Sequence, residues 1–188
     1  MKELIFITGN AYKFESAKRS VEPSGLTLIQ KQLALPEIQS KEVETVASFS
    51  AQLAVQELGV PLVVGDVGYY IEALNGFPGP FIKYINEWLL VEDLLRLMSD
   101  KENRRVVIKE ALAFGAPGIE PVIFTNERVC ALARQAGQTD WAPINQILIP
   151  EGFDRVESEI PREAMLAYHE ANGNHWKALA KYVTEEYR

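Results

Sequence analysis

Residues 5–13 read IFITGNAYK, an apolar run followed by a turn and a polar segment that favours a helix. Gly9 and Asn10 belong to the few residue types that accept left-handed backbone angles. A turn there points successive amide N–H groups, and then a helix N-terminus, at one place. With Lys13 nearby, the stretch predicts an anion-binding turn that starts at Thr8. The same residues also fit a plain strand end and helix cap, and the stretch alone leaves both interpretations open.

Composition excludes several classes of protein. The chain has 188 residues, of which 47% are hydrophobic, so it is long enough to bury the core of one domain. Its single cysteine, Cys130, excludes an internal disulfide, and two histidines are too few for a Cys/His zinc site. Any metal is therefore expected to have oxygen ligands. A net charge of −7 argues against nucleic-acid binding, and with no membrane span or signal peptide we expect a cytoplasmic protein.

Alternating strand and helix patterns predict an α/β fold. Strands are expected over residues 3–8, 26–33, 61–64, 106–114, 121–132 and 147–149. Helices are expected over residues 14–21, 42–58 and 82–98, with a final helix entered through residues 172–174. The carboxylate of Asp66 follows the strand over 61–64, where α/β sheets commonly bind ligands. The wide apolar surface of residues 82–98 favours core packing, with a dimer interface as the alternative.

Several segments in order resemble the inosine triphosphatase family of nucleoside triphosphate pyrophosphatases, which remove deaminated purine nucleotides. The family begins with a strand, Thr-Gly-Asn, two variable residues and Lys, as residues 8–13 do here. LPEIQ at residues 35–39 resembles the family's segment with a metal-binding Glu. Asp66 with ALNGFPGP at residues 73–80 resembles its acidic strand end and the loop that follows. ILIPEG at residues 147–152 and NHWKAL at residues 174–179 resemble two later landmarks.

The resemblance implies a fold and a chemistry. The fold would be a central mixed, twisted sheet with helices forming two lobes around a cleft, a single domain over residues 1–188 that forms a homodimer. The catalytic residue would be Asp66, which with Glu37 would also hold Mg²⁺ through oxygen ligands. The residues expected to bind the nucleoside triphosphate are Thr8, Gly9, Asn10, Lys13, Ser50, Asn145, His175 and Trp176. As an alternative, Glu37 is an exposed loop carboxylate with no ligand.

The chain departs from the family at four places. Gly65 replaces an acidic residue, and Ser50 replaces a lysine expected on the preceding helix. The base-recognition segment falls on residues 142–146, APINQ, without its aromatic residues and its Asp. In the last landmark only His175 is kept, and Trp176 either stacks on a base or packs in the core. Trp141 is a second candidate for stacking.

These changes fall mainly on the part that would recognise the base, so we expect nucleotide binding to persist and specificity to shift. The leading hypothesis is a Mg²⁺-dependent nucleoside triphosphate pyrophosphatase. One alternative is a catalytically impaired relative that binds a nucleotide as a sensor or scaffold. Another is a hydrolase of a different phosphorylated metabolite. The retained Asp66 and Glu37 favour activity, because carboxylates repel phosphates unless a cation lies between them.

Overall fold

The structure is a computed structural model that describes residues 2–137 and 141–187. The chain divides into two compact units, each with its own hydrophobic core. Unit 1 comprises Met1–Asp66, Glu110–Asn126 and Leu166–Arg188, and unit 2 comprises Val67–Lys109 and Glu127–Met165. No described helix has the length and apolar character needed to cross a bilayer.

The strands form one mixed sheet, which confirms the predicted α/β class. Their order is β2-β1-β3-β5-β6-β7, and β4 pairs with β3 outside this path. The strands β1, β2 and β3 run parallel, whereas the pairs β3–β4 and β6–β7 are antiparallel. Their bounds are β1 (Glu3–Ile7), β2 (Thr27–Lys31), β3 (Leu62–Ile71), β4 (Pro78–Gly79), β5 (Arg105–Gly115), β6 (Val122–Leu132) and β7 (Leu148–Pro150).

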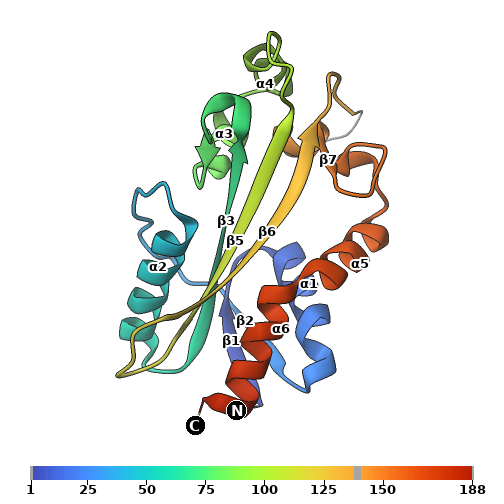
Figure 1. Cartoon of the computed structure of the whole chain (residues 1–188). Helices are drawn as coiled ribbons and strands as arrows, with labels where there is room; N and C mark the ends of the chain where they lie inside the picture. Colours follow the sequence, from blue (N-terminus) through green and yellow to red (C-terminus); the bar gives the residue numbers. More distant parts are fainter. Residues whose placement is uncertain (1, 138–140, 188) are drawn as a thin grey trace. The chain divides into compact units, whose positions relative to one another are not determined.

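In unit 1, helices cover both faces of the sheet (Figure 1). Helices α1 (Ala11–Val21) and α6 (Asn174–Lys181) pack together over the face to which Leu4, Phe6 and Phe114 point. Side chains alternate between the faces of a strand, so Gly115 points to the opposite face. There, a Cβ on Gly115 would lie 2.8 Å from Val55 Cγ2 of helix α2 (Val43–Leu58), which shows how closely α2 packs. After α6 the chain continues as a π-helical turn, η5 (Tyr182–Glu186).

Unit 2 packs its short helices around a second core that contains Ile71, Ile108 and Leu132. The helices are α3 (Ile82–Trp88) and α4 (Val91–Leu97), with the short 3-10 turns η2 (Glu72–Leu74), η3 (Pro143–Gln146) and η4 (Glu157–Glu159). A further 3-10 turn, η1 (Glu22–Ser24), belongs to unit 1, and helix α5 (Arg162–Asn172) contributes residues to both units.

Two sequence-based expectations were wrong in extent, and one helix was missed. The strand expected to stop at residue 64 continues to Ile71, because Gly65 and Asp66 do not break it. The single helix expected over residues 82–98 is two helices, since the backbone is extended at Leu89 and Leu90. The Leu90 N–H is capped by the Asp93 carboxylate, at 3.0 Å. Helix α5 was not predicted, although its sequence begins after Pro161, a residue that commonly precedes or starts a helix.

Candidate functional site

The parallel ladders of β1 end at one common edge of the sheet. Ile7 is the last residue of β1 to pair, opposite Lys31 of β2 on one side and Val64 of β3 on the other. The residues that follow these three positions lie just beyond the pairing with β1. They are Thr8 and Gly9 after β1, Gln32 after β2, and Gly65 and Asp66 within β3. Ligands of α/β sheets bind beyond the carboxyl ends of the strands, and this edge is such a place.

The Thr8-Gly9-Asn10 turn is held by short-range hydrogen bonds. The Asn10 N–H donates to Thr8 Oγ1 at 3.1 Å, and the Lys13 N–H donates to Asn10 Oδ1 at 3.0 Å. Asn10 is therefore the N-cap of α1, with φ −91° and ψ 108°. Gly9 and Asn10 can adopt left-handed backbone angles, but neither has a positive φ in this turn. A Cβ at position 9 would lie 3.2 Å from Gln32 Nε2, so a side chain there would displace the glutamine by a few tenths of an ångström.

Capping and anion binding are compatible at this turn. A helix N-terminus has four N–H groups without an intrahelical acceptor, and the Asn10 side chain accepts from one of them. Gly9, Asn10 and Lys13 are exposed, so the turn is open to a ligand from solvent. The positive end of the α1 dipole and the Lys13 ammonium both favour a negatively charged group there.

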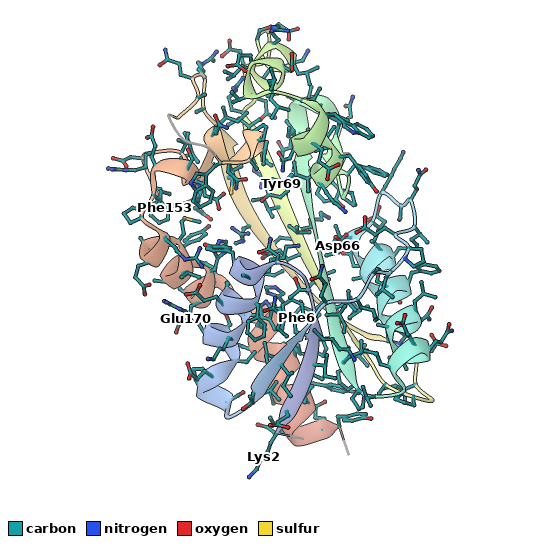
Figure 2. All side chains as sticks on the ribbon, turned by 180° about the vertical axis from the view of Figure 1, so that it is seen from behind. Lys2, Phe6, Asp66, Tyr69, Phe153 and Glu170 are labelled. Carbon is teal, nitrogen blue, oxygen red and sulfur yellow. The ribbon has the colours of Figure 1, made fainter. Side chains whose placement is uncertain are left out.

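Asp66 is a half-buried residue inside β3, two positions beyond the last residue that pairs with β1 (Figure 2). Its neighbour Gly65 faces the core, because a Cβ on Gly65 would lie 3.0 Å from Leu112 Cδ2 and 3.7 Å from Phe6 Cε2. By alternation along the strand, Asp66 points to the opposite face, the one that α2 covers. The carboxylate is thus placed by the strand itself rather than by a flexible loop.

The packing around Gly65 gives a physical account of the missing acidic residue. The backbone at position 65 lies against the apolar side chains of Leu112 and Phe6. A carboxylate on this side would lose hydration against carbon atoms, which is costly without a charged partner. The glycine therefore suits the local packing of unit 1.

Two further predicted residues lie in unit 1. Glu37 is exposed in the segment between β2 and α2, and Ser50 is 7% exposed on α2. The exposed position of Glu37 agrees with the alternative that it is a loop carboxylate, and it is also accessible to a metal ion. Ser50 lies on the buried side of α2, as its place in the amphipathic pattern predicts.

His175 and Trp176 are both buried at the start of α6. The Trp176 ring is 7% exposed and meets Phe6 edge to face, with ring centroids 4.9 Å apart. These contacts match the core-packing alternative for Trp176, so Trp176 is left out of the proposed nucleotide site. His175 is 5% exposed, and its ring lies 5.9 Å from that of Trp176.

Asn145 is the one predicted site residue that belongs to unit 2. It lies on η3, and its Nδ2 donates to Glu157 Oε2 at 2.8 Å. Glu157 is buried, so this hydrogen bond holds the Asn145 amide in one orientation. Trp141, which follows residues outside the described part of the chain, is 37% exposed.

Sequence reasoning missed two glutamines beside the turn. Gln30 Nε2 donates to the Thr8 carbonyl oxygen at 3.1 Å, and the Gln32 side chain lies along Gly9. These glutamines can be found only from the way in which the strands are paired. Polar residues at the end of a strand become neighbours of the turn once β2 is paired with β1 in parallel.

Two variants of Asn10 separate its capping role from anion binding. Asn10→Ala removes the cap, and we expect it to lower the free energy of unfolding by about 1 kcal/mol. Asn10→Asp keeps the cap, and we expect an unchanged melting temperature. The new charge opposes phosphate, so KM for a nucleoside triphosphate should rise about tenfold or more. Thermal melts and steady-state kinetics of both variants check this, and an unchanged KM in Asn10→Asp would leave the turn as a cap alone.

Known proteins share both sequence and fold with this chain. The model of the Ham1 family matches residues 4–171. The dITP/XTP pyrophosphatase of Methanopyrus kandleri is 34% identical over 158 residues, 84% of each chain. That of Methanothermobacter marburgensis is 30% identical over 186 residues, 98% of each chain. Among solved structures, a HAM1 protein from Coxiella burnetii has a TM-score of 0.80 at 18% identity, covering 98% of this chain and all of that one.

Proposed function

The chain belongs to the Ham1 family, and from this premise we propose that it hydrolyses nucleoside triphosphates to monophosphates and pyrophosphate. Relatives that align over most of both chains carry the name dITP/XTP pyrophosphatase. We propose a house-cleaning role on deaminated purine nucleotides, with a base preference shifted from that of its relatives. The observation that carries the proposal is the place where the β1–β3 pairing stops, with the capped Thr8-Gly9-Asn10 turn after β1 and Asp66 two residues further along β3.

The residues at this edge suit an attack of water at the α-phosphorus. Asp66 accepts a proton from the attacking water, and the water oxygen forms a bond to the α-phosphorus. The bond from the α-phosphorus to the bridging oxygen breaks, and its electron pair leaves with pyrophosphate. Lys13 and the N-terminus of α1 counter the negative charge of the phosphates, while the Thr8 hydroxyl and the Asn10 amide orient their oxygens.

Glu37 and Asp66 are the two carboxylates that the proposed site offers to a divalent cation. Among residues 2–137 and 141–187, no group of three or more His, Cys, Asp or Glu side chains is placed to hold a metal. Mg²⁺ keeps several waters and is commonly bound by one or two carboxylates together with substrate phosphates. Glu37 and Asp66 can supply these carboxylates. We therefore propose that Glu37 and Asp66 would hold Mg²⁺ together with the phosphates, and that the ion would neutralise phosphate charge there.

The proposal of a shifted base preference rests on unit 2. The amide of Asn145 is held by Glu157, so it presents a fixed donor and acceptor pattern in place of a carboxylate. An amide accepts and donates, whereas an ionised carboxylate only accepts, so the set of base edges that match it differs.

A panel of nucleotides tests the function directly. The wild-type protein is incubated with Mg²⁺ and dITP, XTP, ITP and the four ordinary nucleoside triphosphates, and pyrophosphate and monophosphate are measured. We expect equal amounts of both products, with the highest kcat/KM on a deaminated purine. Nucleotide binding without any product would instead support the second candidate, an inactive nucleotide-binding relative, which Gly65 and Ser50 favour because they remove a carboxylate and a cation.

We also propose that the protein is a cytoplasmic homodimer. Trp88 and Leu90, at the junction of α3 and α4, are 72% and 68% exposed, and such exposure of large apolar side chains is typical of an interaction site. Trp88 also packs against Tyr84, with ring centroids 5.3 Å apart, which makes a firm aromatic surface.

Leu90→Glu is expected to convert the dimer into a monomer, because it places a charge in an apolar contact. Light scattering coupled to size-exclusion chromatography measures the mass of both proteins. Glu92→Gln, on the same short helix, is the control and should stay dimeric. A wild-type protein that is a monomer at micromolar concentration would contradict the proposal.

A further inference from the structure

The end of β2 lies directly beside the phosphate-binding turn. Lys31 pairs with Ile7, and the Thr8 N–H donates to the Lys31 carbonyl oxygen at 3.0 Å. The next residue of β2, Gln32, has its side chain along Gly9. A Cβ on Gly9 would lie 3.2 Å from Gln32 Nε2 and 3.3 Å from Gln32 Cδ. The glutamine amide therefore lies close against the backbone of the turn at Gly9.

The two glutamines at this edge have different tasks. Gln30 Nε2 donates to the Thr8 carbonyl oxygen at 3.1 Å, so Gln30 positions the turn. Gln32 is exposed, and its amide lies next to the place where the backbone leaves β1. A side-chain amide offers two N–H donors without a charge, which suits the oxygens of a phosphate group.

The strand order also decides which of the three residues at this edge of the sheet lies between the other two. Asp66 belongs to β3, Gly9 follows β1 in the middle, and Gln32 follows β2. Neighbouring strands are separated by about 4.8 Å, and the Gln32 amide reaches across to Gly9 of the middle strand, so this amide lies roughly one strand spacing from β3. With Asp66 at the α-phosphorus, a phosphate chain that runs over Gly9 brings its terminal group to Gln32.

We propose that Gln32 binds the terminal phosphate and so distinguishes nucleoside triphosphates from diphosphates. This inference rests on the proposed function and adds a specificity-determining residue to the same site. A diphosphate placed with its α-phosphorus at Asp66 ends before it reaches Gln32, whereas a triphosphate gains the contact.

The test compares Gln32→Met and Gln32→Glu with the wild-type protein. Methionine keeps the length of the side chain without its N–H groups, and glutamate adds a charge that opposes phosphate. We measure kcat/KM for dITP and the inhibition constant of dIDP. For Gln32→Met, kcat/KM should fall about tenfold while the inhibition constant of dIDP stays within twofold. Gln32→Glu should lose more on dITP, and Gln56→Glu, an equal charge change on the exposed side of α2, should match wild type.

The outcomes separate this inference from the function on which it rests. Unchanged kinetics for dITP, or equal losses for dITP and dIDP, would overturn the role of Gln32 and leave the pyrophosphatase activity in place. If the wild-type protein releases no pyrophosphate, the function fails. The inference is then decided by calorimetry with inorganic tripolyphosphate and pyrophosphate. Tighter binding of tripolyphosphate that Gln32→Glu abolishes supports it, and equal binding by both proteins overturns it. Matching melting temperatures show that each variant is folded.

Discussion

Asp66→Asn is expected to reduce kcat by about 10²–10⁴ while the protein stays folded. Asparagine has nearly the size of aspartate, so the strand β3 and its packing are retained. The amide, however, accepts no proton from water at neutral pH and gives no negative oxygen to a cation. Pyrophosphate release under saturating dITP and Mg²⁺ measures the loss, and a thermal melt measures the fold.

The control for Asp66→Asn is the same change at Asp154. This residue lies in unit 2, is exposed, and pairs with Arg155 at 3.0 Å. Asp154→Asn is expected to leave kcat unchanged. A kcat of Asp66→Asn equal to wild type would show that the chemistry lies on another residue.

Phe6→Ala is expected to lower the free energy of unfolding by about 3–5 kcal/mol. Phe6 is 2% exposed in the core of unit 1, where its ring meets that of Trp176 and lies near the backbone of Gly65. Alanine loses the buried apolar area and leaves a cavity between β1 and α6. Because β1 carries the turn, we also expect weaker nucleotide binding at temperatures where the variant is still folded.

Phe6→Leu is the matched control for the loss of volume. Leucine fills most of the space, so we expect a cost of about 1–2 kcal/mol. Urea denaturation of the three proteins gives these differences. Equal stability of Phe6→Ala and wild type would mean that this core adds little to the fold.

Much of the fold follows from local patterns in the sequence. The apolar run before Thr8 and the strand patterns of residues 106–114 and 121–132 predicted β1, β5 and β6 within a few residues. The strand at 61–64 was cut short because glycine and aspartate normally disfavour strands. In the structure, Gly65 is favoured by the close approach of Leu112, a tertiary contact that no local pattern shows.

The candidate site was predicted less completely than the fold. Thr8, Asn10 and Asp66 stand out because each follows or lies within an apolar strand. The glutamines of β2 do not, since their role depends on which strand lies beside β1 and in what register. Trp176 stood out in the sequence but its role was ambiguous. An aromatic residue at the start of a helix fits stacking on a base as well as packing on Phe6.

The central claim is that water attacks the α-phosphorus at the place where β1 ends and its pairing with β3 stops. Hydrolysis of dITP in water enriched in ¹⁸O tests it, with mass spectrometry of both products from the wild-type protein. We predict one ¹⁸O atom in the monophosphate, none in pyrophosphate, and no labelled product with Asp66→Asn over the same time. Label in pyrophosphate, or release of inorganic phosphate and a diphosphate, would contradict the account.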